Sequence, residues 1–251
     1  MNGFFKTMGP FVALAALGAL AGCGDRNFGF NWGGEEGVKL AELNLAGTAP
    51  DEIVMFGPDA VQVTSGEPFA VTVDGDEAAA KHVRFKLEDG TLGIMREHGN
   101  WSTNGVATIH VTVPNARRLI LAGSGTMTSD KLSGNAHVSI AGSGHLATPS
   151  VAATSLKVEI AGSGTYDGAG TADSLDLSLA GSGMGSMAGL KVGSAKVNIA
   201  GSGEAVFASD GDVDARIMGS GTVTVRGSAR CKVNSVGSGG LVCEREPEHA
   251  G

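Results

Sequence analysis

Three kinds of residue are scarce in this 251-residue sequence. Basic side chains are outnumbered, 18 Lys and Arg against 26 Asp and Glu, and a net charge of −8 argues against a nucleic-acid-binding protein. Cysteine occurs only three times, and never with the CxxC spacing that zinc and redox sites use. Aromatic residues make up 5% of the chain. The motifs HExxH, GxSxG and GK[ST] are absent as well, so the sequence predicts no metal site, no cofactor and no nucleophile.

The N-terminus lacks a hydrophobic run long enough to cross a bilayer, because the apolar stretch Pro10 to Leu20 is too short for a spanning helix. With Lys6 before it, this stretch predicts a signal peptide over residues 1–22. Residues 20–23 read LAGC and resemble the bacterial lipobox. The resemblance implies that the chain is cut before Cys23, which becomes the N-terminal residue, and that the Cys23 thiol is lipidated. The alternative is an ordinary secreted protein cut near the same place.

Lipidation would place the mature protein in a membrane through its N-terminal lipid. Because Gly24 and not aspartate follows Cys23, the resemblance implies an outer membrane lipoprotein that faces the periplasm or the outside. A glycine-rich tether without periodicity is expected over residues 23–37, a single β-helix domain over 38–243, and a polar tail over 244–251. Loss of the signal peptide leaves 17 basic against 26 acidic residues, a net charge of −9.

Glycine is abundant, with 41 residues, and it recurs in a fixed pattern. The tripeptide GSG begins at residues 123, 142, 162, 181, 201, 219 and 237, so consecutive copies are 18 to 20 residues apart. Alternating apolar residues precede each copy, as in Leu156-x-Val158-x-Ile160, which is the pattern of a strand with one buried face. The repeat predicts an all-β solenoid in which each GSG is a stacked corner, since glycine adopts positive φ without strain.

Charged residues also repeat with the corners. The residue five positions before each GSG is, in order, Arg118, His137, Lys157, Asp176, Lys196, Asp214 and Lys232. From Lys157 onward the sign of the charge alternates with every repeat. If successive repeats stack as parallel strands, these side chains form a ladder of opposite charges.

Cys231 and Cys243 remain once Cys23 is set aside, an even number in an exported chain, and they predict one disulfide. When the repeats are aligned on GSG, Cys231 stands in the last repeat where Leu156, Leu175 and Val213 stand in earlier ones. The two cysteines flank the last GSG. We expect the bond to close the final coil as a cap.

The run from Val38 to Cys243 resembles the family of putative auto-transporter adhesin head GIN domains. The resemblance lies in the opening TAPDEIVMFGPDAVQVTSGEPFAVTV, the segment LEDGTLGIMREHG, the step HVTVPNARRLILAGSG and the GSG series that follows. It implies a right-handed parallel β-helix on an exported or lipid-anchored bacterial protein, with no established enzymatic activity.

Two functions remain as expectations. The first is a structural or adhesive role in the cell envelope without catalysis, with a glycan or an envelope protein as partner. The second is a glycan-cleaving or glycan-modifying β-helix enzyme, for which Asp212 and Asp214, outward on one strand, are the nearest acid/base pair. Such an enzyme would expose aromatic rings in its groove, yet the chain has a single tyrosine, Tyr166. The sequence therefore favours the non-enzymatic function, and leaves the oligomeric state open.

Overall fold

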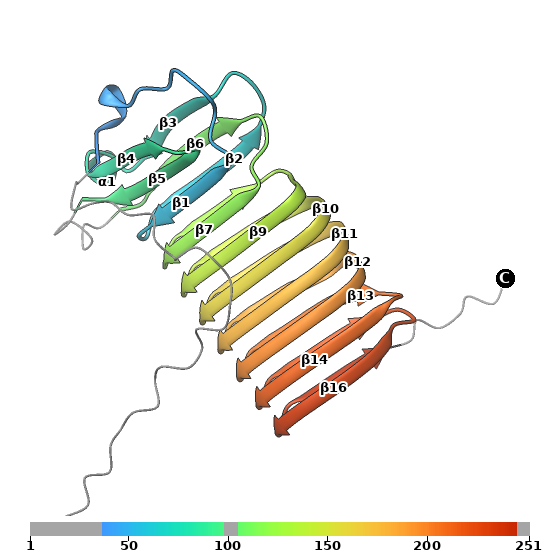
Figure 1. The fold of residues 1–251 in the computed structure, drawn as a ribbon. Helices are drawn as coiled ribbons and strands as arrows, with labels where there is room; N and C mark the ends of the chain where they lie inside the picture. Colours follow the sequence, from blue (N-terminus) through green and yellow to red (C-terminus); the bar gives the residue numbers. More distant parts are fainter. Residues whose placement is uncertain (1–36, 98–104, 245–251) are drawn as a thin grey trace, which may run out of the picture. The chain divides into compact units, whose positions relative to one another are not determined.

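The computed structural model describes residues 37–97 and 105–244. Strands make up 71% and helices 3% of this part, and the strands wind into a parallel β-solenoid of about 7 turns (Figure 1). This confirms the fold expected from the repeats. The predicted signal peptide, Cys23, all but the last residue of the predicted tether, and all but the first residue of the predicted polar tail lie outside the described residues. Within the described residues, no helix has the length and apolar character needed to cross a membrane.

Residues 37–97 and 105–244 contain two short helices, and the other elements are strands. The helices are η1 (Leu40–Glu42) and α1 (Glu77–Ala80). The strands are β1 (Glu52–Phe56), β2 (Ala60–Ser65), β3 (Ala70–Gly75), β4 (Val83–Glu88), β5 (Thr91–Arg96), β6 (Ala107–Val113), β7 (Arg118–Gly123), β8 (Thr126–Ser129), β9 (Leu132–Gly142), β10 (His145–Gly162), β11 (Thr165–Gly181), β12 (Met184–Gly201), β13 (Glu204–Ser209), β14 (Asp212–Gly219), β15 (Thr222–Arg226), β16 (Arg230–Gly237) and β17 (Gly240–Glu244).

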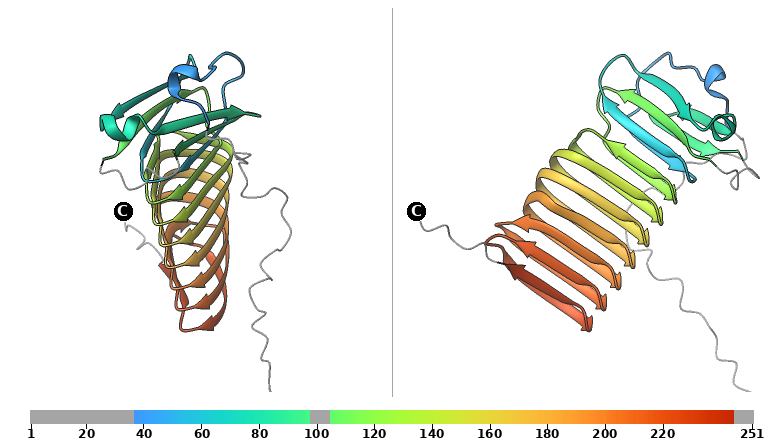
Figure 2. Two further views of the ribbon diagram at one scale, coloured as in Figure 1. Left: turned by 90° about the vertical axis from the view of Figure 1, so that its left-hand side faces the viewer. Right: turned by 180° about the vertical axis from the view of Figure 1, so that it is seen from behind.

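The N-terminal end of the solenoid departs from a simple coil. Strand β1 pairs in parallel with β5 on one side and β7 on the other, so the coil of β5 and β6 stacks outside that of β1 and β2, which precede it in sequence. Beyond this coil, β4 runs antiparallel to β5 and β3 antiparallel to β6. These antiparallel strands end the parallel stack, and Figure 2 shows them gathered at the end opposite the C-terminal coils.

The core is built from columns of apolar side chains that run along the solenoid. One column contains Leu119, Val138, Val158, Leu177, Val197, Ala215 and Val233, and the neighbouring column contains Leu121, Ile140, Ile160, Leu179, Ile199, Ile217 and Ser235. The alternation before each GSG predicts that these positions face the interior. Tyr166 is also inside, fully buried, with its hydroxyl 2.5 Å from the Thr148 hydroxyl and Gly185 beside it in the next coil.

The GSG tripeptides form the corners. The first glycine of every copy has a φ between 116° and 132°. In every copy but the last, its carbonyl accepts a backbone hydrogen bond from the next corner, as in Ser182 N to Gly162 O at 2.9 Å. At Gly181 a β-carbon would lie 2.4 Å from the Gly162 carbonyl oxygen. Glycine is needed there because both the backbone angle and the close approach of the preceding corner exclude a side chain.

Candidate polar face

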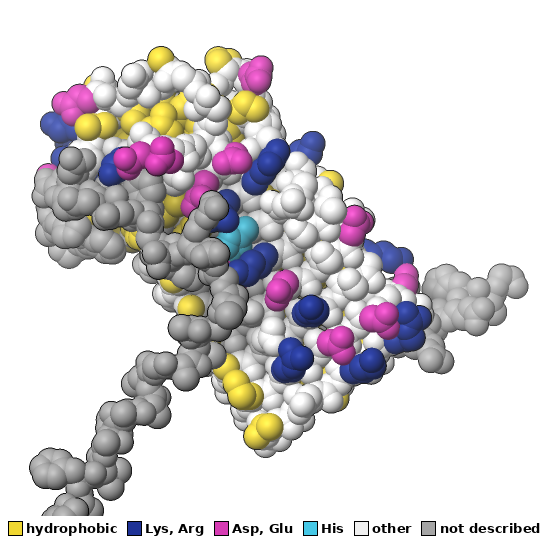
Figure 3. All heavy atoms as spheres, viewed as in Figure 1, with side chains coloured by type: hydrophobic (Ala, Val, Ile, Leu, Met, Phe, Trp, Pro, Cys, Tyr) yellow, Lys and Arg dark blue, Asp and Glu magenta, His cyan; other side chains and the backbone are white. Residues whose placement is uncertain are grey.

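The most regular surface of the solenoid is the outward side of the strands that lead into the corners, which we call the polar face. It comprises the outward residues of β7, β14 and β16 and of the second halves of β9 to β12, and Figure 3 shows Lys, Arg, Asp and Glu intermixed on it. A hydroxyl and amide column contains Asn135, Ser155, Ser174 and Ser194 in register. A second column contains Ile120, Ser139, Glu159, Ser178, Asn198, Arg216 and Asn234, and of these Ser139 is buried.

The charge ladder lies between these two columns. Asp176 is the register partner of both Lys157 and Lys196, and Asp214 is the partner of both Lys196 and Lys232. The charges that alternate in sign along the sequence therefore lie on successive neighbouring strands. Parallel neighbours are about 4.8 Å apart, so each charge has opposite charges on both sides.

The ladder charges attract one another without close ion pairs. Among the described residues, no basic nitrogen of the ladder lies within 4.0 Å of a ladder carboxylate oxygen. Lys157 instead pairs along its own strand, with its Nζ 2.9 Å from Glu159 Oε1. Glu159 Oε2 also lies 2.7 Å from His137 Nε2, so this carboxylate contacts Lys157 on its own strand and His137 in the adjacent coil. Positive and negative side chains are therefore intermixed on the polar face.

Burial and hydrogen bonding together set the protonation of the His137 and Glu159 pair. Burial lowers the pKa of His137 below 6.5, and the hydrogen bond that the imidazole donates to Glu159 only partly opposes this. Burial also raises the pKa of Glu159, but hydrogen bonds from Lys157 and His137 outweigh it, so the net pKa is lowered. At neutral pH the arrangement is a neutral imidazole whose N–H donates to a carboxylate.

A shallow groove of about 440 Å³ crosses the polar face over β10, β11, β12 and β14. Its polar lining comes from the serine column, the ladder and one further carboxylate: Ser155, Lys157, Ser174, Asp176, Ser194, Lys196, Asp212 and Asp214. Hydroxyls, carboxylates and ammonium groups supply donors and acceptors along its length. None of its lining residues is aromatic. Such a lining can hydrogen-bond a polyhydroxylated polymer but provides no ring for stacking against a sugar.

Asp212 and Asp214, the pair considered for acid/base catalysis, lie in the groove but differ in environment. The Arg230 guanidinium donates two hydrogen bonds to Asp212, Nε to Oδ1 at 2.8 Å and Nη2 to Oδ2 at 3.0 Å. This contact lowers the pKa of Asp212, which therefore stays ionised at neutral pH and is a poor general acid.

Glu52, whose pKa burial raises, lies on β1 beside Arg118, at the other end of the solenoid. Within the described residues, no cluster of His, Cys, Asp and Glu could hold a metal ion.

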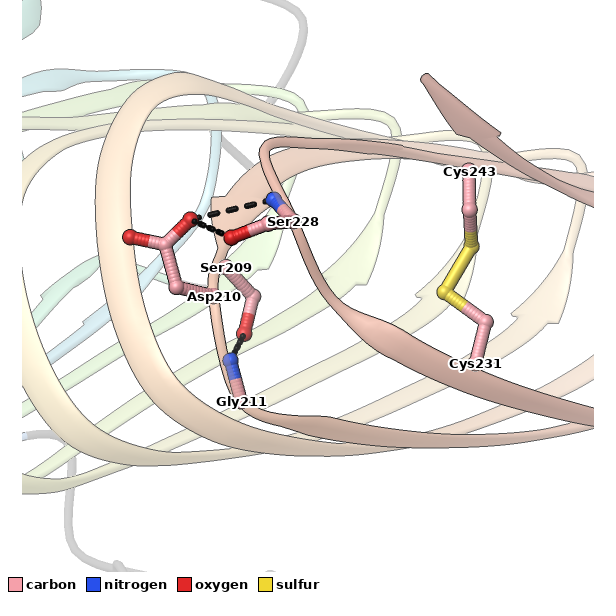
Figure 4. The surroundings of a disulfide bond; sticks show 6 residues. All are labelled: Ser209, Asp210, Gly211, Ser228, Cys231 and Cys243. Carbon is pink, nitrogen blue, oxygen red and sulfur yellow. Dashed lines mark hydrogen bonds between the residues drawn. A yellow bond between two sulfur atoms is a disulfide. The ribbon is translucent and has the colours of Figure 1, made fainter. Parts of the chain in front are cut away.

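The last coil holds the disulfide. Cys231 on β16 is bonded to Cys243 on β17, with their Cα atoms 6.8 Å apart, and the bond crosses the coil (Figure 4). Beside it, Asp210 accepts hydrogen bonds of 3.0 Å from the Ser228 backbone and hydroxyl. A hydrogen bond from Lys191, followed by those from Ser228, lowers the pKa of Asp210 to about 2. These contacts fasten the turn before β16 to the coil before it.

Sequence reasoning missed a buried ion pair in the first coils. Asp59 and Arg96 are both buried, their side chains are hydrogen-bonded to each other, and Asp59 Oδ1 also accepts from the Ala107 amide at 2.9 Å. Asp59 lies at the third corner position, because Gly125 N donates to Gly57 O and Thr126 N to Asp59 O. The signal was present, since Gly57-Pro58-Asp59 stands where later coils have GSG.

A family model and several solved structures resemble this chain. The model described as "Putative auto-transporter adhesin, head GIN domain" matches residues 49–229. A putative adhesin from Bacteroides fragilis is 18% identical with a TM-score of 0.70, and the alignment covers 78% of this chain and 93% of that one. A putative lipid binding protein from Parabacteroides distasonis is 23% identical with a TM-score of 0.61, over 78% and 93% of the two chains.

A third structure, a putative adhesin from Parabacteroides merdae, is 18% identical with a TM-score of 0.61, over 78% of this chain and 92% of that one. Among curated proteins, none matches the sequence. At these identities the structural likeness bears on the fold alone.

Proposed function

Because this chain belongs to the family of putative auto-transporter adhesin head GIN domains, whose model matches residues 49–229, we propose that it is a non-catalytic, adhesin-like binding protein of the cell envelope. The names of the similar solved structures, putative adhesins and a putative lipid binding protein, support a binding role. The partner we propose is an extended glycan held on the polar face.

The observation that carries this proposal is the repetition of side chains in register across the polar face. Ser155, Ser174 and Ser194 lie at intervals of one strand, about 4.8 Å, and charges of both signs run beside them. The Ser155 and Ser174 hydroxyls donate to Asn135 Oδ1 and to the Thr154 carbonyl, so toward a ligand they act as hydrogen-bond acceptors. A polymer with repeating hydroxyls and carboxylates can meet the same donors and acceptors at several coils. Many weak contacts of this kind add up to useful affinity through multivalency.

A matched pair of substitutions tests the polar face. Ser178→Arg places a bulky side chain on the face, and it fits the register because Arg216 occupies the same column two coils later. Thr224→Arg on β15 makes the same change on another side of the solenoid. On immobilised bacterial and animal glycans, we expect Ser178→Arg to lose binding at least tenfold and Thr224→Arg to bind normally. Equal binding by the two variants would reject the polar face, and binding to envelope protein alone would reject the glycan.

We also propose that the mature protein is held in the outer membrane by lipid on Cys23. The support is the lipobox-like sequence LAGC at residues 20–23, followed by Gly24. Replacing Cys23 by alanine removes the acylated thiol, and we expect the protein to move from the membrane fraction to the soluble periplasmic fraction. Undiminished membrane association of Cys23→Ala would contradict the anchor without affecting the proposal for the polar face.

A further inference from the structure

The C-terminal coil ends the stack with open strand edges. Among the described residues, β16 pairs only with β14, and β17 only with β15. The outer edge of each strand therefore presents backbone N–H and C=O groups that no described strand pairs. An unpaired edge of this kind is a template for another strand.

Apolar side chains gather at the same end. Seven large hydrophobic residues are exposed in the described part of the chain, and four of them belong to the last two coils: Met218 at 58%, Val233 at 51%, Val236 at 71% and Val242 at 48%. Val233 continues an interior column and is exposed because no coil follows. The disulfide crosses this coil but leaves Val233 open, so it caps the end less completely than the sequence suggests. Met218, Val236 and Val242 alternate with inward residues and therefore lie on the outer wall of the last two coils. Hydrophobic side chains are visible at the lower end of the solenoid in Figure 3.

The opposite end of the solenoid is built differently. There β3 and β4 run antiparallel to the strands beneath them, and among the described residues their outer edges have no strand partner beyond one bridge between Val38 and Phe85. Phe85 on β4 is buried, and so is the Asp59 and Arg96 ion pair in the adjoining coils. Head-to-tail stacking, which would build a filament, would therefore join two edges of different strand arrangement. Two copies of the C-terminal coil, by contrast, present the same open edge to each other.

We propose that the last coil binds the last coil of a second copy and forms a closed, two-fold symmetric dimer. Around a two-fold axis, β16 of one copy runs antiparallel to β16 of the other. With the axis at Val233, the two Val233 side chains face each other on the interior side, and Cys231 lies opposite Ser235. On the polar face, Lys232 then lies opposite Asn234 of the second copy, so no like charges meet.

The oligomeric state of the full chain carrying Cys23→Ala, purified from the periplasm, tests this proposal. We expect sedimentation equilibrium to give a mass that approaches twice the monomer as concentration rises. Val233→Lys puts two ammonium groups on the axis and should give a monomer that still melts cooperatively. Met184→Lys is the matched control, since Met184 is 43% exposed and lies outside the last two coils, and it should remain dimeric.

Two further variants test the register of the strands. Asn234→Lys sets a second cation opposite Lys232 and should weaken the dimer at least tenfold, whereas Asn234→Asp should strengthen it. A monomer at every concentration, a species that keeps growing beyond the dimer, or a Val233→Lys variant that still dimerises would overturn the proposal. So would an intact chain that is monomeric but dimerises when cut after Glu244, because its own C-terminal residues would then cover the coil.

Discussion

Replacing Asp176 by lysine converts the centre of the charge ladder from attraction to repulsion. Asp176 is in register with Lys157 on one side and Lys196 on the other, so the variant places three cations on adjacent strands. Asp176 is exposed, and the neighbouring ammonium groups also reach solvent, which makes water the relevant dielectric.

The size of the effect follows from the strand spacing. Two unit charges about 5 Å apart in water interact by about 0.8 kcal/mol, and the variant reverses the sign of two such interactions. Salt at physiological strength screens over about 8 Å, and the long side chains can swing apart, which brings the expected loss of unfolding free energy to about 1 kcal/mol. For a domain of this size, that corresponds to a fall in Tm of roughly 2–4 °C.

Thermal unfolding at two salt concentrations measures this prediction. The loss of stability for Asp176→Lys should grow at low ionic strength and shrink at high ionic strength, because it is electrostatic. Asp173→Lys is the matched control: it makes the same change of charge in the same coil at an exposed position outside the ladder. If the two variants melt at the same temperature, or if salt has no effect on their difference, the reasoning from the ladder is wrong.

Three other perturbations follow from the corners, the buried histidine and the disulfide. Gly181→Ala should lower stability by at least about 2 kcal/mol in urea unfolding, since its β-carbon would meet a carbonyl oxygen at 2.4 Å, while Gly240→Ala, with no atom within 4 Å, should be near neutral. The lowered pKa of His137 means that the unfolded chain binds its proton first, so stability should decline as pH falls below about 6.5, and His137→Gln should flatten that slope. Glu159 extends the decline below pH 4.5, because its folded pKa is also lowered. Cys231→Ser should cost about 2–3 kcal/mol of stability, and free thiols in peptide mass spectra of the unreduced wild-type protein would contradict the bond.

The repeated half of the chain could be predicted because its period fixes its register. Once GSG is read as a corner, the side chains at constant distance from it must fall into columns, and the positions of Leu177 and Asp176 follow without further information. The position of Cys231 below Val213 follows in the same way. Column order is a property of sequence spacing alone.

The first half of the fold could not be predicted in this way, because residues 38–117 contain no GSG to fix which strands are neighbours. The alternation of apolar residues in β6 is typical of a strand, but its pairing with β2 and β3 depends on tertiary contacts. The side-chain contacts on the polar face could not be predicted from the sequence either. Lys157 can extend along its strand to Glu159 as readily as across to Asp176, and spacing does not decide between them.

The alternating ladder restricts how the length of this protein can change. Inserting or deleting one whole coil shifts the end of the stack by about 4.8 Å and keeps the apolar columns aligned. Removing the coil that carries Asp176, however, would bring Lys157 beside Lys196, whereas removing the next coil as well would bring Lys157 beside Asp214. Two coils are therefore the smallest unit of growth or loss that preserves both packing and charge, and we expect length variants of this solenoid to differ by pairs of coils.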